Sequence, residues 1–378
     1  MVLDTITRPG LQGVIAAETR LSYIDGLAGV LIINGYALET IAPHAIFEEM
    51  VYLLWHDRLP TQQELADFQA QWAKLRTLPD VAIETLRQAA TKKLDTMDAL
   101  RMAAGLLSLN TNPDNAPDAA LAMVAAFPTI VAAYWRLIQG QEPIAPSSSL
   151  SHAANYLYML DGETPSDERV RALNTYLNTV IDHGFNASTF TARVIASTHS
   201  DMVAAIVGAI GALKGPIHGG APGPALDMVF EIGQPQNAET VLRKKLDAGE
   251  RLMGFGHRVY KVRDPRADVL NVAAERFFAQ GEQLDLYKLV RHVEAKAVEL
   301  LEEYKPGRNL QTNVEFYTAL VLHGIGLDAS MFTPTFAISR VGGWTAHAIE
   351  HLREGRLLRP LAHYTGDSGR EWLPIKSR

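Results

Sequence analysis

The sequence contains no cysteine among its 378 residues. This absence excludes disulfide bonds, thiolate nucleophiles and zinc sites with cysteine ligands. Basic residues do not predominate either, because 35 Lys and Arg stand against 42 Asp and Glu, for a net charge of −7. General nucleic-acid binders are normally basic, so that class is not expected, and a basic cluster in this chain indicates a local site.

Long apolar runs are also scarce. The longest candidate for a membrane span, residues 202–213 (MVAAIVGAIGAL), is shorter than the roughly 20 residues that a transmembrane helix needs. The first residues, MVLDTITRPGLQGV, lack the basic and apolar regions of a signal peptide. We therefore expect a soluble, cytoplasmic protein.

The composition that is present, 47% hydrophobic and 20% charged, is that of an ordinary globular protein. Most of the chain has a helical pattern. Thr61–Glu64 forms a capping box before a helix with an apolar face, and the apolar residues of 170–181 repeat every three to four positions, with Gly184 as a possible helix end. The strand signal is best at residues 21–36, where Asp25-Gly26 indicates a hairpin turn. The sequence predicts an all-α fold with at most a short N-terminal β-hairpin.

Two segments rich in glycine and proline, residues 213–227 and 304–313, have the composition of hinges. A chain of this length is also long for one core, which favours two domains. We expect a large helical domain made of residues 1–218 and 321–378. Residues 219–320 are expected to form a smaller domain inserted in it.

A dense basic cluster surrounds the sequence Gly254-Phe255-Gly256-His257. Its members are Arg251, Arg258, Lys261, Arg263 and Arg266, with Asp264 among them. Glycines expose backbone amides, and cations beside them favour phosphates or carboxylates. The spacing is not that of a dinucleotide fold or a P-loop. The cluster indicates an anion site, and the alternative is a solvated basic loop.

Two further segments carry candidate chemistry. His218 lies in Gly-Pro-Ile-His-Gly-Gly, where small neighbours would let a ligand approach the imidazole; the alternative is a turn histidine before a helix. Glu315 lies between Val314 and Phe316, where an apolar setting would raise the pKa of its carboxyl and make it a base; the alternative is an outward-facing residue.

A short metal-like pattern stands apart from these. His347-Ala-Ile-Glu-His351 fits the H-x-x-E-H pattern of one metallopeptidase group, and its two histidines would share a helix face. The sequence indicates no third ligand. We therefore predict no metal site, and a solvated helix end is the favoured interpretation.

Eight ordered segments together resemble the citrate synthase family. They are GLQGVIAAETRLSYIDG, FEEMVYLLW, DHGFNASTFTARVIAST, GPIHGGAPG, MGFGHRVYKVRDPRA, TNVEFYTALVLHGIG, FAISRVGGWTAHAIEH and LLRPLAHYTG. The resemblance implies an almost entirely helical, two-domain enzyme that acts as a homodimer and needs no cofactor or metal. It implies an acyltransferase that condenses acetyl-CoA with oxaloacetate and water to citrate and CoA, a step of the tricarboxylic acid cycle.

The resemblance also implies roles for residues. His218 would stabilise the enol of acetyl-CoA, Glu315 would remove the methyl proton, and His257 would polarise the oxaloacetate carbonyl. The positions that would bind the oxaloacetate carboxylates are His183, Arg266, Arg340 and Arg359, the last of them reaching the neighbouring protomer's site. The smaller domain would contact CoA through Gly254, Phe255, Gly256, Arg258 and Lys261.

One position departs from the family's best-known pattern, which has Asp where this chain has Glu315. The substitution keeps the carboxylate but lengthens the side chain by one methylene. Three alternatives stay open: a 2-methylcitrate synthase that uses propionyl-CoA, a zinc hydrolase built on His347 and His351, and a non-catalytic helical regulator. One methylene of substrate changes specificity by only about 10- to 200-fold, so the sequence does not separate the two thioesters.

Overall fold

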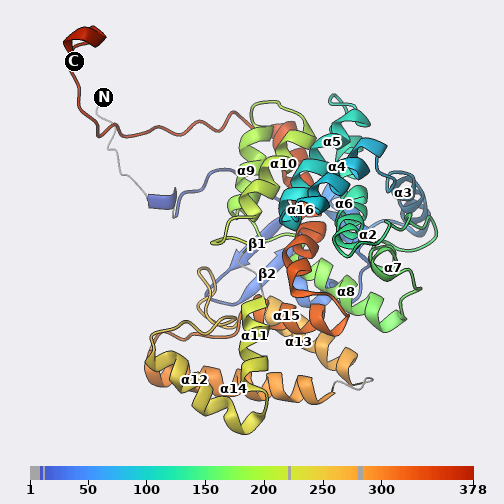
Figure 1. Cartoon of the computed structure of the whole chain (residues 1–378), viewed down its shortest axis with the longest axis vertical. Helices are drawn as coiled ribbons and strands as arrows, with labels where there is room; N and C mark the ends of the chain where they lie inside the picture. The colour runs from blue at the N-terminus through green and yellow to red at the C-terminus, as the bar shows by residue number, and fades with distance from the viewer. Residues whose placement is uncertain (1–8, 12, 220–222, 280–283) are drawn as a thin grey trace.

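The computed structural model describes residues 9–11, 13–219, 223–279 and 284–378. Within these residues the chain forms sixteen α-helices and one small sheet (Figure 1). The predicted all-α fold is confirmed. Most of the helices pack around one large apolar core that runs from Leu21 to Ile349.

The small sheet is slightly larger than the predicted hairpin. Its antiparallel strands are β1 (Ser22–Asp25), β2 (Val30–Ile33) and β3 (Tyr36–Ala37). Ser22 pairs with Ile33 and Asp25 with Val30, so residues 26–29 form the loop between β1 and β2. The predicted two-residue turn at Asp25-Gly26 is therefore wrong in detail: the Asp25 carboxylate instead accepts hydrogen bonds from the backbone N–H groups of Leu27 and Ala28.

The first half of the chain supplies eight helices. They are α1 (Leu38–Ile41), α2 (Phe47–His56), α3 (Gln62–Lys74), α4 (Asp80–Thr91), α5 (Thr96–Leu106), α6 (Ala116–Ile138), α7 (His152–Asp161) and α8 (Asp167–Val180). The capping box before α3 is confirmed, since the Thr61 side chain accepts a hydrogen bond from the Glu64 N–H. Helix α8 ends at Val180 and not at Gly184. Asp182 and His183 therefore lie in the turn between α8 and α9.

Helix α6 is the one helix in the described part of the chain that is long and apolar enough to cross a membrane. At 23 residues α6 is longer than the segment 202–213, so the prediction that 202–213 is the longest candidate span was wrong. In the sequence, Pro128 and the charged Asp118 and Arg136 made this apolar segment less evident. In the structure 72% of its most apolar window is buried, against α4, α5, α7 and α16.

The second half supplies the other eight helices. They are α9 (Ala187–Ala196), α10 (Met202–Leu213), α11 (Gly223–Ile232), α12 (Ala238–Asp247), α13 (Pro265–Phe278), α14 (Leu284–Tyr304), α15 (Val314–Gly324) and α16 (Phe332–Glu354). Short 3₁₀ turns lie at Pro9–Leu11, Leu107–Leu109, Pro235–Asn237, Ala329–Met331 and Ile375–Ser377.

Helices α11, α12 and α14 gather at one end of the molecule, at the bottom of Figure 1. They join the rest through α13 and α15, which both pack against α8. The predicted division at residues 218/219 and 320/321 stays a prediction, and its second boundary falls inside α15. The segments that were expected to act as hinges connect α10 to α11 and α14 to α15.

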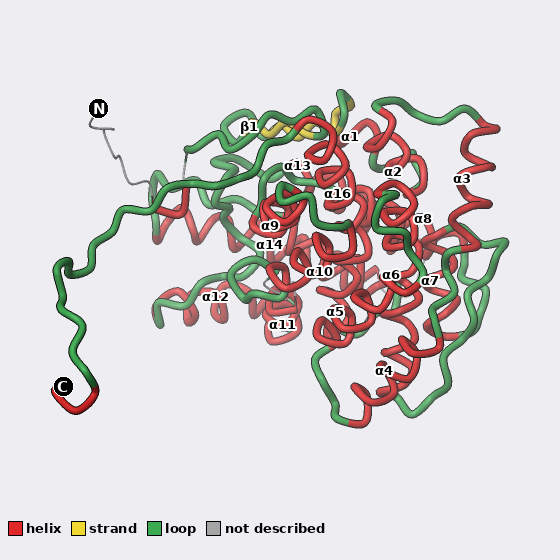
Figure 2. The backbone as a smooth tube through the Cα atoms, turned by 90° about the horizontal axis from the view of Figure 1, so that it is seen from above, coloured by secondary structure: helices red, strands yellow, loops and turns green. Residues whose placement is uncertain are grey.

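The C-terminal residues leave the helical body. Both views show an extended tail after α16 that projects away from the helices (Figure 2). All of residues 359–378 are exposed, including the large apolar side chains of Leu361, Tyr364, Trp372 and Ile375. The isolated chain therefore gives this tail no core to pack against.

Candidate active site

His183 lies in the turn after α8, near the buried Arg266 and Arg340. Its Nε2 lies 3.1 Å from the Tyr260 hydroxyl, and its ring meets the His257 ring edge-on at 5.8 Å between centroids. Burial, followed by the charges of Arg266 and Arg340, lowers the pKa of His183 well below its usual value. The ring is therefore neutral at pH 7, and it connects the α8–α9 turn to the segment of residues 254–266.

Arg340, on α16, is buried close enough to His183 for its charge to act on that ring. Its Nε donates to the Val180 carbonyl at 2.8 Å, and its guanidinium carbon lies 4.5 Å from the centroid of the Phe336 ring. No carboxylate lies within ion-pair distance of it among the described residues, and burial lowers the pKa of Arg340 to about 10. A buried cation without a close carboxylate favours the binding of an anion.

His257 faces His183 from the opposite segment. Its Nδ1 lies 3.1 Å from the backbone nitrogens of both Val259 and Tyr260, which donate to it. Burial, with a contribution from Arg266, lowers the pKa of His257 to about 4, so the ring carries one proton. The two backbone donors to Nδ1 favour the proton on Nε2, which lies 3.2 Å from Arg266 Nη2. The ring is thus a neutral donor whose Nε2–H is directed beside a cation.

Arg266, at the start of α13, is held by Asp264. Its Nε and Nη2 donate to the two Asp264 oxygens at 3.0 and 2.8 Å. Burial alone would lower the pKa of Arg266, but Asp264 more than offsets this and raises it. Asp264 also accepts from the Val314 N–H at 3.1 Å, so one carboxylate orients the arginine and joins its segment to the start of α15.

His218 lies just after α10 and contacts Ser188 at the start of α9. The Ser188 backbone N–H donates to His218 Nε2 at 3.3 Å, and the Ser188 hydroxyl lies 2.7 Å from the same atom. Burial and then Arg340 lower the pKa of His218 to about 4. The neutral ring therefore carries its proton on Nδ1.

Glu315 occupies the first turn of α15. Its backbone N–H donates to the side chain of Asn313, which caps the helix, at 2.9 Å. Burial raises the pKa of Glu315 to about 7, while the nearby Arg266 opposes the rise. The carboxyl is therefore balanced between its acid and base forms near neutral pH, as the apolar neighbours in the sequence predicted.

The loop of Gly254, Phe255 and Gly256 is tied to the segment before α15. The Gly256 N–H donates to the Gln311 carbonyl at 2.7 Å, and the Asn313 N–H donates to the Gly254 carbonyl at 2.9 Å. Both glycines have positive φ, 86° and 80°, and a Cβ on Gly254 would lie 2.9 Å from the Phe316 side chain. The glycines are thus explained by local packing, and Arg258 and Lys261, which follow them, are exposed.

The basic cluster therefore divides into three sets. Arg266 is in the site. Arg263 pairs with Asp268 and the buried Glu294, which the sequence argument did not connect to it. Arg251, Arg258 and Lys261 are exposed. Arg359 is separate from these three sets, because it is exposed in the segment that follows α16.

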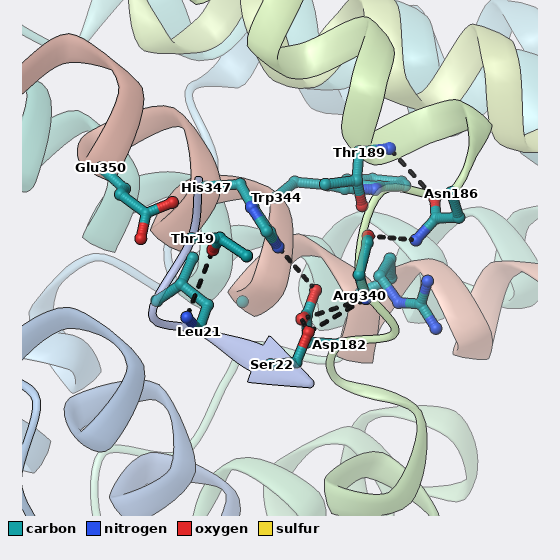
Figure 3. A network of polar contacts seen from close by, with 12 residues as sticks. Thr19, Leu21, Ser22, Asp182, Asn186, Thr189, Arg340, Trp344, His347 and Glu350 are labelled. Atoms are coloured by element: carbon teal, nitrogen blue, oxygen red, sulfur yellow. Dashed lines mark hydrogen bonds and ion pairs between the residues drawn. The ribbon is translucent and has the colours of Figure 1, made fainter. Parts of the chain in front are cut away.

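The metal-like pattern takes part in a buried polar network (Figure 3). His347 Nε2 lies 3.1 Å from Asp182, and its Nδ1 lies 3.0 Å from Arg193. Glu350 accepts from Arg193 at 2.6 Å. His351 is directed elsewhere, with Nε2 3.0 Å from the Arg356 carbonyl. The predicted solvated helix end is wrong for both histidines, because His347 is fully buried and His351 is only 3% exposed.

Several residues at the site were missed by sequence reasoning. Ser188 contacts His218, Tyr260 contacts His183, and Asp264 accepts from Arg266. Asp182 accepts from the N–H of Gly184, the residue after His183. Asp264 had a usable signal, since it is the acid within the basic cluster. The other three are ordinary residues in the sequence, and only the folded chain brings them to the histidines.

Comparisons with known proteins agree with this geometry. The sequence model of the family described as citrate synthase, C-terminal domain, matches residues 10–361. The chain belongs to the citrate synthase family. Citrate synthase 2 of Bacillus subtilis is 41% identical, with 99% of this chain and 100% of the relative covered. The 2-methylcitrate synthase of Mycobacterium tuberculosis is 38% identical, with 96% and 91% covered.

A solved structure extends the comparison to the fold. The citrate synthase of Thermoplasma acidophilum, in a ternary complex with carboxymethyl coenzyme A and oxaloacetate, superposes with a TM-score of 0.87 at 34% identity, covering 98% of this chain and 99% of that one. These matches confirm the predicted family and, with it, the prediction of an acyl-transferring enzyme. The superposition confirms the predicted helical fold.

Proposed function

We propose that this chain is a citrate synthase that condenses acetyl-CoA with oxaloacetate and water to give citrate and CoA. The observation that carries the proposal is the combination of Glu315, with a pKa of about 7, and two neutral histidines, His218 and His257, among buried arginines. A carboxylate base, two neutral donors and two cations are what this condensation requires.

Enolisation is the first step. The Glu315 carboxylate removes a proton from the methyl group of acetyl-CoA while His218 donates a hydrogen bond from Nδ1 to the thioester oxygen. The methyl proton is weakly acidic, so the developing enolate must be stabilised as the proton leaves. A neutral imidazole suits this role, and the low pKa of His218 keeps it neutral.

Carbon–carbon bond formation follows. The enol carbon attacks the ketone of oxaloacetate, and His257 donates its Nε2 proton to the ketone oxygen as that oxygen becomes a hydroxyl. Arg266 and Arg340 bind the carboxylates, with His183 as a neutral donor, because guanidinium groups match carboxylate geometry. Water then cleaves the thioester of citryl-CoA, releasing citrate and CoA, and this hydrolysis supplies the driving force.

The choice of thioester is the main test. CoA release should be measured with acetyl-CoA and with propionyl-CoA, each with oxaloacetate. A kcat/KM that favours acetyl-CoA supports the proposal, and one that favours propionyl-CoA replaces it with 2-methylcitrate synthesis, the function for which the Mycobacterium relative is named. Release of CoA with neither thioester would reject both. We further propose that no cofactor or metal takes part, so activity should survive a chelator.

The proposal includes a homodimer in which Arg359 completes the partner's site. Arg359 lies on an exposed tail whose apolar side chains, among them Leu361 and Trp372, have no packing partner within the described residues of this chain. A second copy of the chain would supply one. An arginine held across the interface would make the dimer obligatory for activity.

Mixed dimers test this sharing. His257→Ala and Arg359→Ala homodimers should both be nearly inactive, since every site lacks one group. In a mixed dimer of differently tagged chains, one site is whole and the other has both defects if Arg359 acts across the interface. Activity approaching half that of the unmutated dimer supports the shared site, whereas activity no higher than that of either parent variant shows that Arg359 acts within its own chain or not at all.

We also propose that the Gly254–Lys261 loop binds CoA, with Arg258 and Lys261 near its phosphates. Both side chains are exposed beside the loop, as phosphate contacts require. Arg258→Ala and Lys261→Ala should raise the KM for acetyl-CoA and leave that for oxaloacetate unchanged. Equal KM values for acetyl-CoA in the variants and the wild type would remove these residues from the CoA site.

A further inference from the structure

The proposed mechanism leaves one buried carboxylate unused. Glu294, on α14, is 5% exposed and contacts the segments that carry His257 and Glu315. Its Oε1 accepts from Arg263 Nη1 and from the Thr312 hydroxyl, both at 2.7 Å. Its Oε2 accepts from Arg291 Nη1 at 2.7 Å and from the Tyr317 hydroxyl at 2.5 Å. Four side chains thus donate to one carboxylate.

Three of these four donors belong to the two segments that carry the proposed catalytic groups, Arg263 to the first and Thr312 and Tyr317 to the second. Arg263 lies next to Asp264, the residue that orients Arg266, and six residues after His257. Thr312 lies three residues before Glu315 and pairs with Phe255 as an isolated β-bridge. A single oxygen of Glu294 therefore binds the His257 segment and the Glu315 segment at once.

Several backbone hydrogen bonds also join these segments, and the Asn313 side chain donates to the Gly256 carbonyl at 2.8 Å. The Asp264 N–H donates to the Thr312 carbonyl at the long distance of 3.3 Å, and the Asp264 carboxylate accepts from the Val314 N–H at 3.1 Å. The place where these two segments lie side by side is called the crossing below. The shorter backbone hydrogen bonds between the segments, at 2.7 and 2.9 Å, lie at its other end, at Gly256 and Gly254. The Glu294 carboxylate thus strengthens the crossing where its backbone pairing is weakest.

We propose that Glu294 is a positioning residue that holds the His257–Arg266 segment and the Glu315 segment in register, so that the base and the carbonyl donor keep their separation during the condensation. This inference rests on the proposed function. Displacement of a catalytic group by about 1 Å costs on the order of 10²-fold in rate, so a loosened crossing lowers kcat. Glu294 touches no substrate, and it acts through Arg263 and Thr312.

Glu294→Gln is the main test. The variant keeps the shape of the side chain but replaces one acceptor oxygen by a donor and removes the charge that pairs with Arg263 and Arg291. We expect kcat to fall about tenfold or more, while the affinity for oxaloacetate, measured by calorimetry, changes less than the rate. The acid limb of the kcat–pH profile should move to lower pH as Glu315 becomes better hydrated.

Glu48→Gln is the matched control. Glu48 is a buried carboxylate on α2, 1% exposed, that accepts from the His152 N–H at 2.9 Å. Its loss should affect stability without moving kcat or the pH profile. A kcat of Glu294→Gln within about twofold of wild type, at a temperature where both are folded, would overturn the proposal.

Thr312→Val and Tyr317→Phe keep the test decisive if Glu294→Gln does not fold. Each variant removes one hydroxyl donor to Glu294 without burying an unpaired charge. Thr312→Val should lower kcat more than Tyr317→Phe does, because only Thr312 shares the Oε1 atom with Arg263. An unchanged kcat in both variants would mean that Glu294 only stabilises the fold and does not hold the segments in register.

Hydrogen exchange separates this inference from the proposed function. In Glu294→Gln or Thr312→Val, the amides of residues 254–266 and 311–317 should exchange faster together, whereas Glu48→Gln should leave both segments protected. If wild type releases no CoA, the proposed function fails, and exchange alone then decides whether Glu294 joins the segments. Unchanged protection in both segments would sink the inference whatever the activity.

Discussion

The two sides of the site hold their arginines in opposite ways. On the side of α16, Arg340 rests on Phe336 and donates to a backbone carbonyl, with no carboxylate in ion-pair distance among the described residues. On the side of α13, Arg266 is gripped through two nitrogens by Asp264. Burial lowers the pKa of Arg340 to about 10, whereas Asp264 raises that of Arg266.

This contrast between the two arginines suits the binding of one dicarboxylate with both affinity and precision. A buried cation without a partner gains most when an anion arrives, because the anion relieves its desolvation. A cation already paired gains less but keeps a defined orientation, and here it also stands beside His257 and Glu315. We therefore assign binding energy mainly to the Arg340 side and alignment mainly to the Arg266 side.

The largest effect is expected on the alignment side, at Glu315. Glu315→Gln removes the base but keeps the shape of the side chain, so enolisation should slow by about 10²-fold or more. The measurement is hydrogen–deuterium exchange at the methyl group of acetyl-CoA, together with CoA release. Near-normal turnover would reject Glu315 as the base, and unchanged oxaloacetate affinity serves as the control.

The second test compares the two arginines directly. Arg340→Met should weaken oxaloacetate binding by about 10- to 100-fold, the worth of charge-assisted hydrogen bonds, while the free energy of unfolding hardly falls. Arg266→Met should weaken binding and also lower the free energy of unfolding by about 3–5 kcal/mol, because Asp264 is left buried and unpaired. Calorimetry and urea unfolding measure both quantities. Equal loss of stability in the two variants would refute the contrast.

A smaller effect follows from the pKa of Glu315. The base form is the ionised one, and the pKa in the folded protein is about 7, above the ordinary 4.5. The rate should therefore fall about tenfold for each pH unit below 7 and level off above it. The kcat–pH profile of the wild type checks this; an acid limb centred near pH 4.5 would show that Glu315 is hydrated or is not the base.

The smallest expected effect is a coupling between the two substrates. Arg266 and His257 share one segment with the Gly254 loop, so oxaloacetate should organise the CoA site when it binds. We expect the affinity for acetyl-CoA to rise about fivefold or more when an unreactive oxaloacetate analogue is present, which is the lower end of typical coupling. Calorimetry with and without the analogue decides, and equal affinities would exclude ordered organisation.

Much of this protein could be predicted from local patterns. The capping box at Thr61–Glu64 and the spacing of apolar residues are short-range features, so the helices they predict are present. The apolar neighbours of Glu315 correctly indicated a raised pKa for its carboxyl. The family motifs named the histidines and arginines of the site, because such side chains form short patterns along the chain.

The loop between β1 and β2 shows where local reasoning fails. Asp25-Gly26 is a typical two-residue turn, yet the chain uses a longer loop. The Lys261 N–H donates to the Gly26 carbonyl at 2.8 Å, and a Cβ on Gly26 would lie 2.4 Å from the Val259 carbonyl oxygen. The loop therefore packs against the His257 segment, a tertiary contact that outweighs the preference of the two residues.

The helical fold, the family and the chemical kinds of group at the site can be read from the sequence alone, because they depend on composition and on spacing along the chain. The folded chain is needed to show that two backbone N–H groups donate to His257 Nδ1, that Asp264 orients Arg266, and that Glu294 contacts both catalytic segments. These features depend on contacts between residues far apart in the chain. A hydrogen bond or an ion pair forms only where folding brings donor and acceptor within about 3 Å, and no local pattern records that distance.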